Sequence, residues 1–233
     1  LVKSADVLIE NFRPGVMNRL GVGYDVLKEI NPRLVYCAIS GFGQEGPMKF
    51  ATAYDQIVQG LSGVMSITGS EETAPLRVGY PVADTIGGIT AAFAVSSALV
   101  RQARTGEGEF IDVSMLDSTV VTMGWVVSNF LIAGKTPRPM GNENFTAAPS
   151  GAFRTGNGLL NIAANKKEQF AALAEAIGRA DLLSDARFAE RETRKVNRKA
   201  LTVEIEAALA AKSAGEWEAL LSKTGVPAGR VLS

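Results

Sequence analysis

The sequence of 233 residues contains no histidine and a single cysteine. Without histidine, the chain lacks the commonest general base, the Ser-His and Cys-His dyads and nearly all kinds of zinc site, so we expect no bound metal. One cysteine cannot form a disulfide within the chain, and Cys37 lies in an apolar run typical of a buried thiol, which indicates a reducing, cytoplasmic compartment. Chemistry must therefore depend on carboxylates, hydroxyls, amines, guanidinium groups or backbone amides.

An excess of charge of one sign is also absent. Lys+Arg and Asp+Glu both number 24, so no global field would hold nucleic acid or an anionic membrane, and an anionic ligand needs a local basic cluster. The longest apolar stretch, residues 89–100, is too short to cross a bilayer. The first residues resemble the end of a helix and the last ones resemble a strand, so we expect a fragment of a longer chain.

The order of the predicted elements indicates an α/β fold. Apolar and β-branched runs predict buried strands at 7–10, 34–40 and 109–114, and these alternate with predicted helices at 14–21, 24–30, 54–61, 84–104 and 116–132. The alternation predicts a doubly wound parallel sheet in a large, Rossmann-like domain over residues 1–133. Residues 134–151, rich in Gly, Pro, Asn and Thr, predict a crossover loop, and residues 152–233 predict a small α+β domain that begins with a hairpin.

A glycine-rich loop follows the second predicted strand. Gly41, Gly43 and Gly46 match the G-x-G-x-x-G fingerprint, so a dinucleotide-binding oxidoreductase is one alternative function. The fingerprint also requires a helix that opens at the third glycine and holds the pyrophosphate. Here Pro47 follows, and helical spacing begins only near residue 53. A tight structural loop is the other interpretation.

Two arginines follow the first predicted strand. Arg13 and Arg19 lie where this strand gives way to a helix, and in open α/β sheets ligands bind in the crevice at the carboxyl ends of the strands. A helix N-terminus and two guanidinium groups would suit a phosphate. A pair of solvated arginines on a surface helix explains the same residues equally well.

Asp84 precedes the longest predicted helix. Asp is a preferred N-cap residue, so one interpretation is purely structural. The other is a nucleophile. The following helix is apolar enough to be buried, its dipole favours the carboxylate anion, and Gly87 and Gly88 would let a ligand approach closely.

Six motifs in register make the chain resemble the class III CoA-transferases, the CaiB/BaiF family that includes formyl-CoA and carnitine CoA-transferases. The motifs lie at 11–15, 40–47, 54–63, 84–88, 105–108 and 111–117. The resemblance implies that Asp84 carries the acyl group and the CoA in turn, through a mixed anhydride and an aspartyl-CoA thioester. It implies that the residues in contact with CoA are Asn11, Phe12, Arg13 and Arg19, with Tyr54 and Asp55 near the active site.

The resemblance further implies an enzyme that moves CoA from an acyl-CoA donor to a small carboxylic acid, without a permanently bound cofactor, as an interlocked homodimer. Many members place a glycine-rich loop over the aspartate, whereas this sequence has only residues 141–144 near that position. The same family contains acyl-CoA racemases, which use a histidine at about Tyr54, and the lack of histidine argues against that alternative. A third interpretation is a non-catalytic folding unit.

Overall fold

A computed structural model describes residues 1–232, which form two compact units, unit 1 (Leu1–Pro139) and unit 2 (Met140–Ser233). The boundary falls inside the glycine- and proline-rich segment 134–151. Each unit has its own β-sheet. The predicted α/β class is confirmed, with a parallel sheet in the first unit and an antiparallel one in the second.

Unit 1 is built on three parallel strands in the order β1-β2-β3, namely β1 (Val7–Glu10), β2 (Val35–Ser40) and β3 (Glu109–Ser114). The register places Glu10 beside Ala38, and Ala38 beside Asp112. All three strands therefore end at the same edge of the sheet. This edge is where side chains that follow the strands can meet a ligand.

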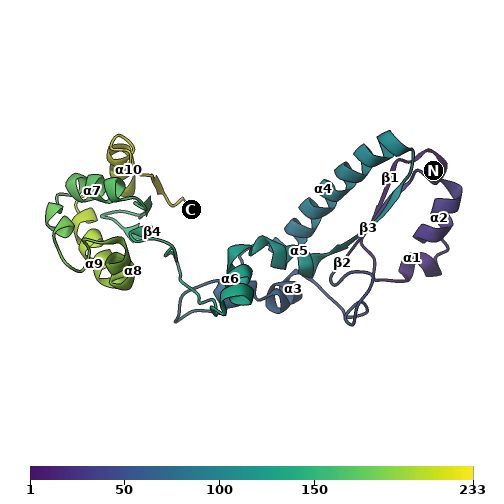
Figure 1. Cartoon of the computed structure of the whole chain (residues 1–233), viewed down its shortest axis with the longest axis horizontal. Coiled ribbons are helices and arrows are strands. Elements are labelled where there is room, and N and C mark those ends of the chain that lie inside the picture. Colours follow the sequence, from purple (N-terminus) through teal and green to yellow (C-terminus); the bar gives the residue numbers. More distant parts are fainter. Residues whose placement is uncertain (233) are drawn as a thin grey trace. The chain divides into compact units, whose positions relative to one another are not determined.

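Helices cover both faces of this sheet, as the doubly wound prediction requires (Figure 1). On one face, α2 (Tyr24–Ile30) packs with the short α1 (Val16–Arg19) and η1 (Val2–Ser4), and the Tyr24 ring lies 5.0 Å from that of Phe110. On the other face, α4 (Val82–Thr105) packs Ala91, Val95 and Ala98 against β2 and β3. The central strand is buried because it is covered from both sides.

The face of the long helix α4 that packs on the sheet consists mainly of small side chains, whereas several of its large apolar side chains are exposed. Ala83 and Ala91 are 0% and 3% exposed, whereas Ile89 and Phe93 are 66% and 74% exposed. The expectation that this apolar helix is buried therefore holds only for the face that packs on the sheet, and the other face is exposed. By length and composition α4 could cross a membrane, but core helices share that property, and α4 packs along the sheet.

Three further helices complete unit 1 beside the short η2 (Val64–Ile67): α3 (Asp55–Ser62), α5 (Met115–Thr122) and α6 (Trp125–Ala133). The prediction of one helix over 116–132 is wrong, because the chain bends by 83° between α5 and α6. The break lies at Gly124, whose φ of 45° and ψ of −110° are outside the helical region. Taken together across the bend, α5 and α6 also meet the length and composition criterion for a membrane span.

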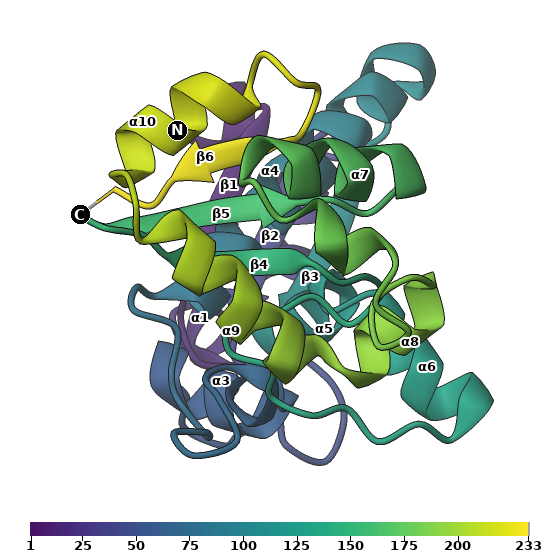
Figure 2. The same cartoon turned by 90° about the vertical axis from the view of Figure 1, so that its left-hand side faces the viewer.

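Unit 2 has the antiparallel order β4-β5-β6, with β4 (Ser150–Arg154), β5 (Leu159–Ala163) and β6 (Ala228–Arg230) (Figure 2). The predicted hairpin is confirmed, since Phe153 pairs with Leu160 across a turn at 155–158. The core lies between the sheet and helices that carry buried Phe170, Leu173 and Ile205. The helical elements are α7 (Lys167–Ala176), η3 (Ala180–Leu183), α8 (Arg191–Val196), α9 (Arg198–Leu209) and α10 (Ala214–Leu221).

Candidate active site

Asp84 lies inside the first turn of α4 and does not cap it. The helix begins at Val82, its N-cap is Pro81, and no side chain of the cap residue accepts a hydrogen bond. The prediction that Asp84 is the N-cap is therefore wrong, because the helix starts two residues earlier. In the first turn the carboxylate still benefits from the positive end of the helix dipole.

The surroundings of Asp84 make its carboxylate more basic than usual. The side chain reaches solvent, yet partial desolvation raises its pKa, and the negative charge of Asp55 raises it further. A Cβ built on Gly88 would meet nothing within 4 Å, so the next turn leaves open space. A Cβ on Gly87 would lie 3.0 Å from Met115 Cγ, so Gly87 serves the packing of α4 on α5 instead. A more basic carboxylate beside open space is suited to nucleophilic attack.

Tyr54 and Asp55 open helix α3 and bring it to the start of α4. Tyr54 is the N-cap of α3, and its ring is 81% exposed. Asp55 Oδ1 accepts a hydrogen bond from Ala83 N at 2.8 Å, and Oδ2 accepts one from Gln59 Nε2 at 2.6 Å. The structure thus gathers Asp55 and Asp84 at one place, while both oxygens of Asp55 are bound within the protein. Their contact with CoA stays a prediction.

The residues after β1 form a second group, at the carboxyl edge of the sheet. Asn11 Nδ2 donates to Ile39 O at 2.7 Å, and Phe12 N donates to Glu10 Oε2 at 2.6 Å, so the turn is tied to β1 and β2. Arg13 and Arg19 are exposed, and within residues 1–232 neither forms an ion pair. Their guanidinium groups are therefore available to an anion, which is the prediction made from the sequence.

The loop at 41–46 lacks the features of a pyrophosphate site. Gly43 and Gly46 have φ of 84° and 88°, which suits glycine in tight turns, and the next helix starts only at Asp55. Gln44 N donates to Asp112 Oδ2 at 2.8 Å, and the adjacent cavity of about 490 Å³ is lined by Glu45, Asp112 and Asp117. These carboxylates would repel a pyrophosphate, so the geometry argues against the dinucleotide alternative.

Three polar residues received no individual role from the sequence, although they lie within the motifs at 40–47 and 54–63. Ser40 Oγ and Gln44 Nε2 are buried at the end of β2 without a hydrogen-bond partner among the described residues. Gln59 is completely buried and binds Asp55. The spacing of Asp55 and Gln59, four residues apart in a predicted helix, was the available signal. The signal for Ser40 was a polar side chain at the end of a buried strand, and the signal for Gln44 was a polar side chain in the loop that follows it.

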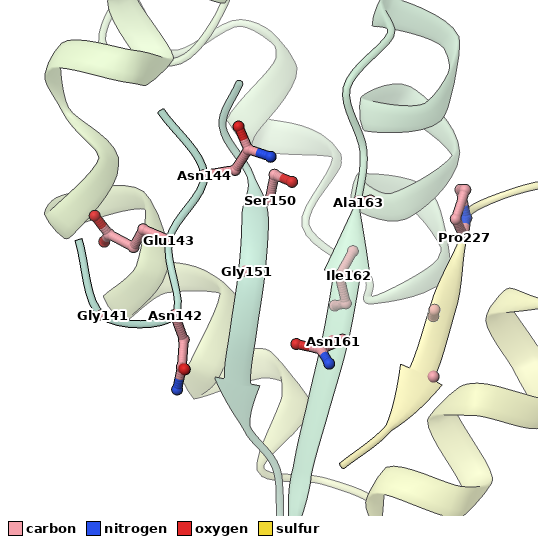
Figure 3. A pocket seen from close by; sticks show the side chains of 12 residues that line it. Gly141, Asn142, Glu143, Asn144, Ser150, Gly151, Asn161, Ile162, Ala163 and Pro227 are labelled. Carbon is pink, nitrogen blue, oxygen red and sulfur yellow. The ribbon is translucent and has the colours of Figure 1, made fainter. Parts of the chain in front are cut away.

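The segment 141–144 lines a cavity of about 540 Å³ in unit 2 (Figure 3). The segment runs beside β4, and Asn161 projects from β5. Glu143 lies 3.7 Å from Arg198 Nη1, so its charge is balanced locally. The other polar linings are amides, a hydroxyl and backbone groups, which provide hydrogen bonds but no nucleophile with a base.

A family model described as CoA-transferase family III matches residues 1–233. The chain belongs to this family. Among its family III relatives, the acetyl-CoA:oxalate CoA-transferase of Acetobacter aceti is 42% identical over 233 residues, which are 100% of this chain and 60% of the relative. The succinyl-CoA:glutarate CoA-transferase of Mus musculus is 35% identical over 233 residues, 100% of this chain and 53% of the relative.

A solved structure of the same family supports the architecture of this family III chain. The crystal structure of a CaiB/BaiF family protein from Brucella suis matches with a TM-score of 0.88 and 38% identity, over 100% of this chain and 61% of that protein. The resemblance inferred from the six motifs is therefore confirmed. The chain spans between half and two thirds of the length of these relatives.

Proposed function

We propose that this chain catalyses the transfer of CoA from an acyl-CoA donor to a small carboxylic acid, with Asp84 as the nucleophile. The observation that carries the proposal is the Asp84 carboxylate, with a raised pKa, in the first turn of α4 beside the open space at Gly88. Relatives named for oxalate and glutarate favour a short dicarboxylate as one substrate. The family resemblance also favours a cytoplasmic homodimer.

In each step of the proposed reaction, either a carboxylate displaces a thiolate from an acyl carbon or a thiolate displaces a carboxylate. An Asp84 oxygen attacks the thioester carbonyl of the donor, the C–S bond breaks, and CoA thiolate leaves with the electron pair, which gives a mixed anhydride. The thiolate then attacks the Asp84 carbonyl carbon and releases the donor acid, which leaves an aspartyl-CoA thioester. The acceptor carboxylate repeats the two steps in reverse order, and Asp84 is regenerated.

This sequence of steps needs no net proton transfer. Each attacking group is already an anion, and each leaving group departs as an anion. A chain with no histidine can therefore catalyse the exchange, provided that it holds Asp84 ionised and near the thioester. A racemase of the same family would need two acid/base groups. One of them is a histidine at the position where this chain has Tyr54.

The CoA site in this proposal is the edge of the unit 1 sheet. Arg13 and Arg19, without ion pairs to other described residues, would bind phosphate oxygens through charge-assisted hydrogen bonds. Asn11 and Phe12 would contact CoA from the turn that their own hydrogen bonds hold in place. Tyr54 and Asp55 would lie near the thioester end, because Asp55 is bound to the backbone next to Asp84.

A trapping experiment tests the role of Asp84. The intact protein, mixed with acetyl-CoA or succinyl-CoA and no acceptor, should acquire an adduct on the Asp84 peptide that hydroxylamine removes, as measured by mass spectrometry. Asp84→Asn should abolish the adduct and lower transfer by about 1,000-fold or more. The melting temperature should not fall, because the cap of α4 does not depend on this side chain and the raised pKa means that the ionised carboxylate does not stabilise the folded state.

Glu168→Gln is the matched control, since Glu168 is an exposed carboxylate in the first turn of α7. It should leave both the adduct and the transfer rate unchanged. A folded Asp84→Asn protein with near-normal transfer would refute the proposal, and Asp55 would become the next carboxylate to test.

A further inference from the structure

Gln59 takes no part in the proposed chemistry, yet its amide is buried completely between α3 and the segment that leads into α4. Its exposed fraction is 0%. Its Nε2 donates to Asp55 Oδ2 at 2.6 Å and to Tyr80 O at 3.4 Å, while its Oε1 accepts from Val78 N at 2.8 Å. A buried amide with both ends paired has one preferred orientation, because turning it over would leave buried donors and acceptors unpaired.

Asp55 carries this constraint to the helix that holds Asp84. The first backbone N–H groups of α4 need acceptors, and the N-cap residue Pro81 has no side-chain acceptor. Asp55 Oδ1 accepts from Ala83 N at 2.8 Å, so a carboxylate from α3 replaces the missing cap. Ala83 directly precedes Asp84 and is itself 0% exposed. The backbone on which Asp84 sits is thus held by a neighbouring helix.

We propose that Gln59 and Asp55 form a clamp that positions Asp84 for attack on the acyl-CoA thioester, with Gln59 as the positioning residue. The inference rests on the proposed function of Asp84. Gln59 binds Asp55 Oδ2, which leaves Oδ1 directed at Ala83 N. Without Gln59, Asp55 is free to rotate, and the first turn of α4 loses its acceptor. The orientation of Asp55 has a second effect, because the negative charge of Asp55 also raises the pKa of Asp84.

The test measures the rate at which the intact protein forms the hydroxylamine-sensitive adduct with saturating acetyl-CoA or succinyl-CoA. Gln59→Met keeps the length of the side chain but removes all its hydrogen bonds. We expect the adduct to form about 10- to 100-fold more slowly, because a displacement of about 1 Å is sufficient for such a loss. The affinity for CoA should stay the same, since Gln59 is completely buried and has no exposed surface with which to contact a ligand.

Gln102→Met is the matched control. Gln102 is also a buried amide, 5% exposed, near the other end of α4, and its Nε2 donates to Arg33 O at 2.6 Å. Losing this bond should lower the melting temperature without changing the rate of adduct formation. If Gln102→Met slows adduct formation as much as Gln59→Met does for a similar loss of melting temperature, the loss of rate reflects stability alone and contradicts the clamp.

An exchange of the two polar groups provides the second test, and it decides the matter if Gln59→Met does not fold. Asp55→Asn alone places two amides next to each other, and Gln59→Glu alone places two carboxylates next to each other. With both changes, the amide at 55 can donate to the carboxylate at 59, while its oxygen still accepts from Ala83 N and the carboxylate accepts from Val78 N. We expect the double variant to form the adduct about 10-fold faster than either single variant.

The outcomes separate the clamp from the chemistry. An adduct on Asp84 in the parent, with an unchanged rate in Gln59→Met or no gain in the double variant, overturns the clamp alone. A parent protein that forms no adduct on Asp84 overturns the proposed function, and the clamp with it.

Discussion

The carboxylates of the two units differ in the direction of their pKa shifts. In unit 1 the pKa values of Glu10 and Asp84 are raised, in both cases chiefly by desolvation. In unit 2 the shifted carboxylates all have lowered pKa values, each chiefly through a side-chain hydrogen bond: Asp181 with Arg179, Asp185 with Arg187, Glu192 with Lys195, and Glu216 with Ser213. The shifted carboxylates of unit 2 are held by side-chain hydrogen bonds, whereas Asp84 in unit 1 is partly desolvated and lies near the negative charge of Asp55.

The two units also differ in the size of their hydrophobic cores. Unit 2 has one cluster of 17 buried apolar residues, while unit 1 has three separate clusters of 6, 4 and 3. Unit 1 also exposes large apolar side chains along α4 and α6, among them Phe93, Leu131 and Ile132. Unit 2 therefore holds itself together by its own packing. The buried apolar clusters around the candidate active site are smaller, and buried polar groups such as Gln59 also hold its helices together.

The largest expected effect sharpens the comparison of the cores. Phe170→Ala in unit 2 removes a ring that is 2% exposed and stacks 4.3 Å from the Arg194 guanidinium carbon, and should cost about 3–5 kcal/mol of unfolding free energy. Phe93→Ala in unit 1 removes a ring that is 74% exposed and should cost about 0.5 kcal/mol or less. Urea unfolding followed by far-UV circular dichroism measures both. Equal losses would contradict the comparison.

A smaller effect tests the difference in ion pairing. Arg13→Ala and Arg19→Ala should each weaken CoA binding to the intact protein by about 1–3 kcal/mol, because each removes a charge-assisted phosphate contact. Titration calorimetry with CoA measures this. Arg154→Ala in unit 2 is the matched control, since Arg154 is also exposed, and it should leave the affinity unchanged. Unchanged affinity in both unit 1 variants would refute the CoA site.

The smallest expected effect concerns pH and has opposite signs in the two units. A raised pKa in the folded state means that ionised Glu10 destabilises unit 1 at neutral pH, and that this penalty disappears as the pH falls through the folded pKa. A lowered pKa means that Glu216 stabilises unit 2 above the unfolded pKa, and that this gain is lost as the pH falls through the folded pKa. The two carboxylates therefore respond to acid in opposite directions.

Matched Glu→Gln variants measure these signs. At pH 7, Glu10→Gln should raise the melting temperature and Glu216→Gln should lower it. Both differences should shrink in acid and vanish once the carboxyls are protonated in the folded and unfolded states, which for Glu216 happens only below its lowered folded pKa. Shifts of the same sign in both variants, or a difference that grows in acid, would show that the two carboxylates are not in the environments described.

Much of unit 1 could be predicted because its signals are local. The helix Tyr24–Ile30 and the strand Glu109–Ser114 have the bounds expected from their apolar pattern and from Asn31-Pro32 and Gly108 beside them. The bend at Gly124 was not predictable, because the apolar pattern of 116–132 continues through it without a break. Likewise, apolar residues surround α4 almost evenly, so only the packed sheet shows that its small face is buried.

The sequence by itself determined the family, through six motifs in register, and limited the chemistry, because the chain has no histidine. Only the tertiary structure decided how the candidate residue Asp84 is held. Asp55 caps α4 from 28 positions away in the chain, and the acceptor of Val78 N, in the loop before α4, is supplied by Gln59 of α3. A hydrogen bond between such distant residues leaves no periodic pattern in the sequence, because it depends on which helices pack together.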